Sequence, residues 1–353
     1  MNAPSLAQRL ADQITQDGPI TVAAFVEAAL YDEAEGFYAS GGQAGRRGDF
    51  ITSVEVGPLF GAVISNAIDA WWEAAGRPSE FTVGELGAGP GTLARTVTLA
   101  QGACLRSGAL RWVMIERSAA QRQSHPTGDH VISLDKVDPT GHYDVFFANE
   151  MLDNIAFAIA AHLDDGWRER RVDLVDGQFA LVDAAVIDPP AGAEPLPVGT
   201  EVAVIDEAVA FIEWLRETWP GARLVFIDYA ATTAELADRD GQWLRAYRDH
   251  QRVVDWLAQP GMTDITIDIP QEQLDRLAPG RIQTQAEFLS EHGIDALVAE
   301  GRRIWADGAH VGDLAAMRAR SRISETEALQ DRNGLGHYRV FQWAPDSGPA
   351  GDR

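Results

Sequence analysis

The feature that most constrains the fold is a short apolar segment that runs directly into a glycine-rich turn. Residues 81–86 predict a buried strand, the turn Glu85-Leu86-Gly87-Ala88-Gly89-Pro90-Gly91 follows, and residues 92–103 predict a helix. Glycine allows the backbone to turn sharply and to approach a ligand without an intervening Cβ. A strand, a glycine turn and a helix in this order are typical of α/β proteins that hold a nucleotide-like ligand at the turn.

Two acidic residues accompany this turn. Glu85 ends the first strand, and Glu116 ends a second strand predicted over 110–115. A carboxylate at Glu85 is poorly suited to a pyrophosphate and well suited to a cationic methionyl group, while Glu116 can accept two hydrogen bonds from ribose hydroxyls. The combination predicts S-adenosyl-L-methionine as the cofactor, bound by Glu85, Gly87, Gly89, Gly91 and Glu116. The alternative interpretation is a tight turn followed by a solvated Glu116.

The rest of the chain continues this alternation of strands and helices. Apolar periodicity predicts strands over 143–148, 223–227 and 336–343, and helices over 58–72 and 201–218, after two short helices within 5–30. This alternation indicates an α/β fold whose mainly parallel sheet is covered on both faces. Residues 157–186 instead alternate like a hairpin, with turns at Asp164-Asp165-Gly166 and Asp176-Gly177.

We expect four regions along the chain, because two stretches interrupt the alternation. The first region is an N-terminal helical segment with a cofactor-covering loop (1–80), and the second is a core that carries the hairpin as an insertion (81–230). The third is an inserted lid or substrate subdomain (231–320), and the fourth is a closing strand (321–345).

Composition narrows the classes of function. Among 353 residues, 46% are apolar and 23% are charged, which is typical of a soluble globular protein. A single cysteine, Cys104, excludes a cysteine-based metal cluster, and the eight histidines lack ligand spacing, so no metal is expected. The net charge of −24 disfavours nucleic acid as a partner and favours cationic ligands. No secretory signal, transit peptide or membrane-spanning run is apparent, which predicts a cytoplasmic protein of bacterial source.

A second polar segment, Asn149-Glu150-Met151-Leu152-Asp153-Asn154, directly follows a predicted strand. Its side chains are therefore expected at the carboxyl end of the sheet, where ligands of open α/β folds collect. Two carboxylates three residues apart, Glu150 and Asp153, could clamp a planar cation such as a guanidinium. The alternative is that they cap the segment that follows.

These motifs resemble the NDUFAF7/MidA family of class I methyltransferases, which comprises a mitochondrial complex I assembly factor, called NDUFAF7 in animals and MidA in other eukaryotes, and its bacterial homologues. The resemblance extends along nearly the whole chain and rests on Gly48-Asp49-Phe50-Ile51-Thr52-Ser53, Phe60-Gly61, Glu85 to Leu93, Asn149 to Asp153, Ile227-Asp228-Tyr229, 244–250, 260–266 and 285–289. Two positions depart from the family pattern. Asn154-Ile155-Ala156 lacks the usual proline, and Ala230 replaces the glycine that usually follows Asp228-Tyr229.

The resemblance implies a class I methyltransferase that methylates an arginine of a protein substrate by direct in-line transfer. We assign Glu150 and Asp153 to the guanidinium, His250 to proton acceptance and Asp49 to closure over the cofactor, and we add Thr52 and Asn149 to the cofactor-binding residues. Two alternatives stay open. One is an assembly or binding protein that keeps the cofactor fold without turnover, and the other is a nicotinamide-dependent oxidoreductase, although the Gly-x-Gly-x-x-Gly spacing is absent.

Overall fold

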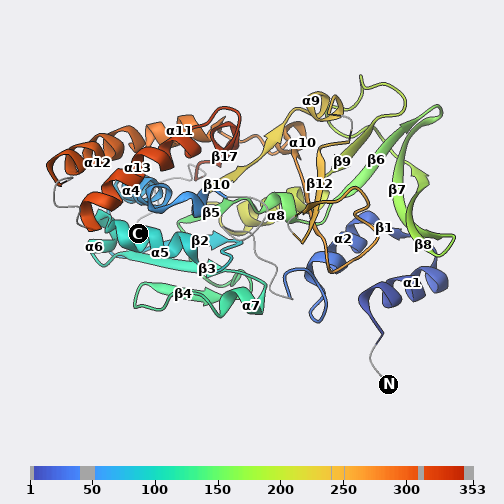
Figure 1. Ribbon diagram of the computed structural model, residues 1–353, viewed down its shortest axis with the longest axis horizontal. Coiled ribbons are helices and arrows are strands. Elements are labelled where there is room, and N and C mark those ends of the chain that lie inside the picture. The colour runs from blue at the N-terminus through green and yellow to red at the C-terminus, as the bar shows by residue number, and fades with distance from the viewer. Residues whose placement is uncertain (1–3, 40–51, 240, 250, 309–313, 346–353) are drawn as a thin grey trace. The chain divides into compact units, whose positions relative to one another are not determined.

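A computed structural model describes residues 4–39, 52–239, 241–249, 251–308 and 314–345. The chain forms two compact units (Figure 1). Unit 1 consists of Met1–Gln43, Met151–Glu217 and Tyr229–Pro279, and unit 2 consists of Ala44–Glu150, Thr218–Asp228 and Gly280–Arg353. Each unit is therefore assembled from segments that lie far apart in the sequence.

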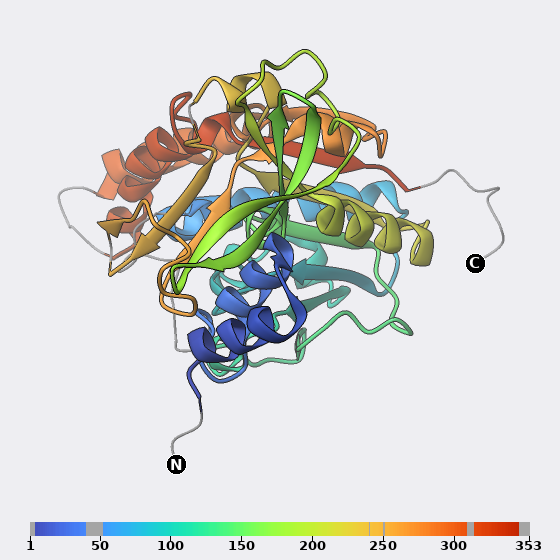
Figure 2. The ribbon, with the colours of Figure 1, turned by 90° about the vertical axis from the view of Figure 1, so that its right-hand side faces the viewer.

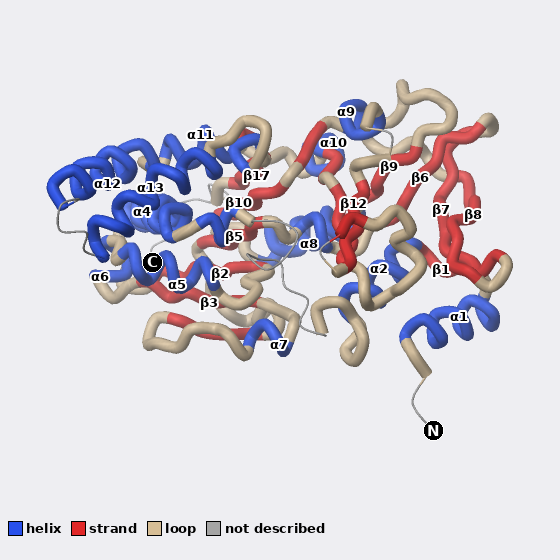
Figure 3. The backbone as a smooth tube through the Cα atoms, viewed as in Figure 1, coloured by secondary structure: helices blue, strands red, loops and turns tan. Residues whose placement is uncertain are grey.

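Unit 2 is built around a seven-stranded sheet with the order β16-β17-β10-β5-β2-β3-β4, whose strands are red in Figure 3. Five strands are parallel: β10 (Arg223–Asp228), β5 (Val145–Asn149), β2 (Phe81–Leu86), β3 (Leu110–Ile115) and β4 (Val131–Leu134). At one edge, β17 (Arg339–Trp343) is antiparallel to β10, and β16 (Arg281–Thr284) is antiparallel to β17. Every residue of β2 is buried, as expected for a central strand of a covered parallel sheet. The mainly parallel α/β sheet predicted from the sequence is confirmed.

The helices of unit 2 pack with this sheet around one apolar core. They are α3 (Ser53–Val56), α4 (Pro58–Ala74), α5 (Thr92–Ala100), α6 (Ala103–Arg106), α7 (Ala119–Arg122), α11 (Gln285–Glu291), α12 (Ile294–Gly308) and α13 (Leu314–Leu329), followed by the 3₁₀ turn η2 (Leu335–His337). Figure 1 shows α4, α5 and α11–α13 gathered beside the strands. The helix predicted over 92–103 is shorter, because Gln101 adopts a left-handed φ of 55° and ends α5 at Ala100.

The long helix α4 is held at its start by a side chain from near the other end of the chain. The carboxylate of Glu325 on α13 accepts a 2.8 Å hydrogen bond from the backbone nitrogen of Leu59. Pro58 occupies the first turn, where its missing N–H costs nothing. Further along, Gly61 lets α4 approach α5 closely, since a Cβ there would lie 2.1 Å from Thr96 Oγ1.

Unit 1 contains mostly antiparallel strands. Its largest sheet has the order β1-β7-β6-β9, and β8 pairs with β7. The strands are β1 (Ile20–Thr21), β6 (Ala158–Leu163), β7 (Gly166–Val175), β8 (Gln178–Val186) and β9 (Glu201–Val204). The predicted hairpin is thus extended to a three-stranded meander with turns at the expected positions, drawn in green as a twisted ribbon in Figure 2.

Unit 1 also contains smaller sheets and several helical elements. A second sheet has the order β13-β12-β14, formed by β13 (Gln251–Arg252), β12 (Leu244–Arg248) and β14 (Asp264–Ile267), and β11 (Ala230–Ala231) pairs with β15 (Ile269–Pro270). The helical elements are α1 (Leu6–Asp17), α2 (Val22–Tyr31), η1 (Leu152–Asn154), α8 (Asp206–Thr218), α9 (Thr233–Ala237) and α10 (Gln271–Asp275).

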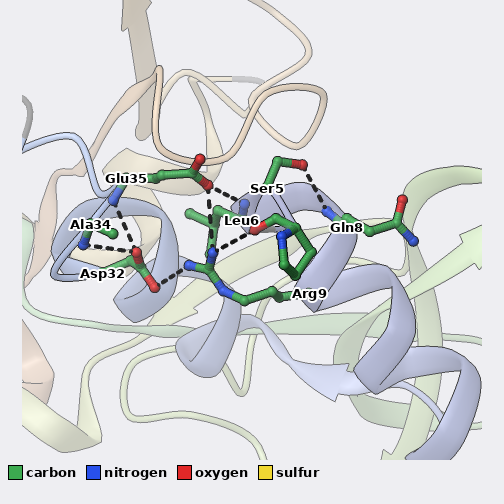
Figure 4. Close-up of polar contacts among 8 residues, drawn as sticks. Ser5, Leu6, Gln8, Arg9, Asp32, Ala34 and Glu35 are labelled. Carbon is green, nitrogen blue, oxygen red and sulfur yellow. Dashed lines mark hydrogen bonds and ion pairs between the residues drawn. The ribbon is translucent and has the colours of Figure 1, made fainter. Parts of the chain in front are cut away.

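The two N-terminal helices match the prediction, including Thr21 as the N-cap of α2, where its side chain accepts from the nitrogen of Ala24. Figure 4 shows how α1 is fastened to the turn after α2. Arg9 contacts Asp32 at 2.5 Å and Glu35 at 3.6 Å. The Asp32 carboxylate also accepts from the backbone nitrogens of Ala34 and Glu35, so one acidic turn anchors the arginine.

Other boundaries also differ from those expected. The helix predicted over 201–218 begins only at Asp206, because Glu201–Val204 pairs with β6 as a strand. Residues 280–320 belong to unit 2 rather than to the inserted subdomain, because β16 joins the large sheet beside β17. None of the helices in the described part of the chain is both long and apolar enough to cross a membrane.

Candidate functional site

The glycine turn leaves β2 and enters α5 with a sharply bent backbone. Gly87, Gly89 and Gly91 have φ values of 64°, 52° and 77°, in the left-handed region that favours glycine. At Gly91, a Cβ would lie 2.7 Å from Pro126 Cδ and 3.1 Å from Met114 Sδ, so the turn packs tightly there. At Gly89, a Cβ would meet no atom within 4 Å. The turn therefore presents open space at Gly89 beside the carboxyl end of β2.

Glu116 lies against this turn, as the sequence predicts. One carboxylate oxygen accepts a 3.0 Å hydrogen bond from the nitrogen of Gly89, and the other accepts a 2.7 Å bond from the nitrogen of Ser118. Burial raises the pKa of the Glu116 carboxyl, and the two backbone donors oppose this effect. The residue is therefore held at the turn by main-chain groups on both sides of its carboxylate.

The environment of Glu85 differs from the one expected for an ionised carboxylate at the end of a strand. Its side chain is buried, and Oε2 accepts a 2.7 Å hydrogen bond from Trp112 Nε1 on the neighbouring strand β3. Burial raises the pKa of Glu85 to about 8, and the nearby Glu116 adds to the rise. The carboxyl is therefore mostly protonated at pH 7. Its role in cofactor binding stays a prediction, but the negative charge expected of it is largely absent at that pH.

Two of the predicted cofactor-binding residues carry buried polar atoms without a hydrogen-bond partner among the described residues. These atoms are Thr52 Oγ1, at the start of α3, and Asn149 Oδ1, at the end of β5. An unsatisfied buried polar group is costly unless a ligand or water completes it. Both atoms lie in unit 2, which also contains the glycine turn.

Glu150 follows β5 with a left-handed φ of 52°, which is unusual for a residue with a side chain. Its nitrogen donates a 2.8 Å hydrogen bond to the carbonyl of Ile227. Its Oε1 accepts from the nitrogen of Ser53 and from Asn149 Nδ2, both at 2.9 Å. Glu150 thus secures the first turn of α3 to the carboxyl end of β5, which partly agrees with the capping alternative. The helix it caps, however, lies almost 100 residues earlier in the chain.

Asp153 lies on η1 in unit 1 and is 4% exposed. Its Oδ2 accepts from the hydroxyl of Tyr229 and, at 2.6 Å, from the hydroxyl of Thr266. Burial raises the pKa of the carboxyl, while the two hydroxyl donors and the charge of Arg245 oppose the rise. The other oxygen, Oδ1, is buried and has no hydrogen-bond partner in the described part of unit 1.

Charged residues lie next to the two hydroxyl groups that donate to Asp153. Arg245 lies across from Thr266 in the β12–β14 ladder, and its guanidinium carbon is 4.4 Å from the centre of the Tyr229 ring. Arg245 also contacts Asp268 at 2.6 Å, and Asp268 binds Arg239. Sequence reasoning identified neither Thr266 nor Arg245 as part of a polar cluster, because only the pairing of β12 with β14 brings them together.

The two remaining predicted site residues, Asp49 and His250, lie outside the described residues. Within the described ranges, no group of three or more histidine, cysteine or acidic side chains is arranged to hold a metal ion.

Comparison with known proteins identifies the family of this chain and its cofactor. A model of a family of S-adenosyl-L-methionine-dependent methyltransferases matches residues 63–287. The chain belongs to this family. The matched region contains the glycine turn, Glu116 and Glu150, so the predicted methyltransferase class and its cofactor are confirmed.

Curated relatives and solved structures agree with this assignment. The chain is 25% identical to protein arginine methyltransferase NDUFAF7, mitochondrial, of Danio rerio over 336 residues, covering 83% of this chain and 77% of the relative. The human protein of the same name is 27% identical over 332 residues, covering 82% and 74%. A crystal structure of a Burkholderia thailandensis protein bound to S-adenosyl-homocysteine superposes with a TM-score of 0.78 at 24% identity, covering 100% of this chain and 99% of that chain. The resemblance to the NDUFAF7/MidA family is confirmed, and the superposition shows the same fold.

The residues of this methyltransferase fit its cofactor. An adenosyl ligand could use the open space at Gly89, the carboxylate of Glu116 beside it, and the buried oxygens of Thr52 and Asn149 that have no partner among the described residues. These residues would hold the cofactor at the carboxyl end of the parallel strands.

Proposed function

We propose that this methyltransferase N-methylates arginine in a protein substrate. The observation that carries the proposal is the name protein arginine methyltransferase, shared by relatives that match more than four-fifths of the chain. The formal charge of −24 supports it, because an acidic protein attracts a cationic acceptor. A cytoplasmic protein with an accessible arginine is the partner that this proposal requires.

S-adenosyl-L-methionine supplies the methyl group when it is bound. The methyl group would pass to a guanidinium nitrogen, the remainder of the cofactor would leave as S-adenosyl-homocysteine, and the nitrogen would release one proton to the solvent. No covalent enzyme intermediate is needed, so the protein acts mainly by positioning, which can lower a barrier by about 7–11 kcal/mol.

We assign the carboxylates of Glu150 and Asp153 to binding of the acceptor guanidinium, and the contacts of each residue support its role separately. Glu150 is held in a left-handed conformation by backbone contacts, so its carboxylate has a fixed direction. Asp153 has one oxygen bound by two hydroxyls and the other without a partner in the described residues, which suits a further N–H donor. Carboxylate–guanidinium bonds are charge-assisted and roughly twice as strong as neutral ones.

The test is to incubate the full chain with isotope-labelled S-adenosyl-L-methionine and a host lysate, and to map methylated residues by mass spectrometry. The expected result is label on an arginine of a protein, absent when Glu150→Gln replaces the wild type. Label on another residue type, or on a small molecule, would contradict the arginine assignment. Cofactor binding without any transfer would favour the assembly or binding protein instead.

A further inference from the structure

We propose that His125 is a positioning residue that holds the glycine turn at the carbonyl of Gly89, as Glu116 holds it at the nitrogen, and thereby sets the affinity for the cofactor. His125 lies in the loop between α7 and β4. Its Nε2 is 2.8 Å from the carbonyl oxygen of Gly89, while the nitrogen of Gly89 donates to Glu116. A single residue of the turn is thus bound at both of its main-chain groups.

The peptide that His125 binds has a particular need for such a contact. It joins Gly89 to Pro90, so it contains no N–H and offers only its carbonyl oxygen for a hydrogen bond. Gly89 also rotates more freely than any residue with a side chain. The imidazole contact therefore restrains the Gly89–Pro90 peptide, while the Glu116 carboxylate restrains the preceding Ala88–Gly89 peptide through the nitrogen of Gly89.

The loop that carries His125 is itself fixed. The Nδ1 of His125 is 2.8 Å from Ser133 Oγ on β4, and Arg95 on α5 donates to the carbonyl of Ser124. Pro126 occupies the position next to Gly91 where a Cβ would collide with it. The loop therefore contacts the turn both through the ring of His125 and through the packing of Pro126.

The hydrogen-bond pattern specifies the state of the ring. A carbonyl only accepts, so Nε2 must carry a proton, and the neutral ring then accepts the Ser133 hydroxyl at Nδ1. Burial lowers the pKa of His125, the bond to the Gly89 carbonyl opposes this effect, and Arg122 and Arg95 lower the pKa further, so the net change favours the neutral ring at pH 7.

The consequence is a turn that is ordered before the ligand arrives. A ligand that must order its own site binds more weakly, because the entropy of ordering is subtracted from its binding free energy. Loss of one such hydrogen bond is expected to weaken cofactor binding by about 3- to 10-fold.

The experiment measures the dissociation constant of S-adenosyl-homocysteine by calorimetry, and the melting temperature without ligand, for three variants of the full chain. His125→Leu removes the donor, His125→Gln retains an N–H at the end of the side chain, and His162→Leu is the matched control. His162 makes the same kind of contact, from Nδ1 to the carbonyl of Leu196 at 2.8 Å, within unit 1.

We expect about 3- to 10-fold weaker binding in His125→Leu, a smaller loss in His125→Gln and unchanged affinity in His162→Leu. Wild-type affinity in His125→Leu, or an equal loss in the control, would overturn the proposal. A second measurement needs no variant, so it remains decisive if His125→Leu does not fold. In ¹⁵N-histidine spectra of the wild type, the proton must reside on Nε2 of His125, and a proton on Nδ1 alone would refute the contact.

Discussion

Glu85 and Trp112 are joined across neighbouring parallel strands by a hydrogen bond of 2.7 Å, donated by the indole nitrogen to the carboxyl group. The acid is buried between apolar strands, and this burial raises its pKa to about 8 although the bond from Trp112 opposes the rise. The raised pKa has a direct consequence for the dependence of stability on pH.

Glu85→Gln should stabilise the protein increasingly as the pH rises from about 5 to 8. The folded-state pKa of about 8 lies above the ordinary value of 4.5, so the unfolded chain releases a proton that the folded chain retains. The free energy of unfolding then falls with rising pH across this range, by at most about 1.4 kcal/mol per unit. Glutamine keeps the acceptor for Trp112 and removes the titration. Melting curves without ligand test this, with the exposed Glu80→Gln as the control that should leave the profile unchanged.

Gly89→Val should abolish detectable binding of S-adenosyl-homocysteine in a chain that still folds. The side chain would fill the open space at the turn, and its φ of 52° would add strain. Gly177→Val is the matched control, because Gly177 has a φ of 78°, no neighbours within 4 Å and a place in the β7–β8 turn. Both variants should lose similar melting temperature, and only the first should lose affinity by calorimetry. Equal affinities would show that the cofactor lies elsewhere.

Glu150→Gln should leave the affinity for S-adenosyl-homocysteine nearly unchanged and reduce single-turnover methyl transfer strongly. The amide oxygen can still accept from Ser53, so α3 keeps its attachment. The amide nitrogen, however, presents a donor to a guanidinium that has only donors, and the charge is lost. Normal turnover with a lowered melting temperature would mean that Glu150 serves only as a cap.

Tyr229→Phe should destabilise unit 1 by about 1–3 kcal/mol, because it removes a donor from a buried carboxylate. The pKa of Asp153 is already raised by burial, and losing the hydroxyl raises it further, so the loss of stability should grow as the pH rises. Tyr31→Phe is the control, since that hydroxyl donates to the neutral carbonyl of Asn154 at 3.1 Å. A loss for Tyr229→Phe that is independent of pH would exclude Asp153 as the group affected.

Much of unit 2 could be predicted from the sequence because its strands have strong local signals. The strands predicted at 81–86 and 110–115 have the bounds of β2 and β3, since each is a compact apolar segment bounded by turn residues. The pairing of Glu116 with the glycine turn followed from the same order of elements. The predicted cytoplasmic location and the roles of Asp49 and His250 stay predictions.

The remaining features depend on strand order, which local patterns do not contain. The sequence identifies Glu85 as an acid at a strand end, but only the fold brings Trp112 to it through the pairing of β2 with β3 and buries the carboxyl so that its pKa rises. His125 lies in a loop without apolar periodicity, so no local signal connects it with Gly89. The helix predicted over 201–218 covers the strand Glu201–Val204, because four residues are too few to show the alternation of a strand.

The position of β17 in the large sheet also determines when that sheet can be completed during synthesis. This strand, Arg339–Trp343, lies between β16 and β10, and the ribosome adds it after the other six strands of the sheet. Until β17 emerges, β10 lacks its neighbour on one side and β16 cannot join the sheet at all. Helix α13, whose Glu325 anchors the start of α4, is also made long after α4. A nascent chain must therefore carry an unfinished, exposed sheet edge at β10 until β17 has been made, and a chaperone contact would matter most in that interval.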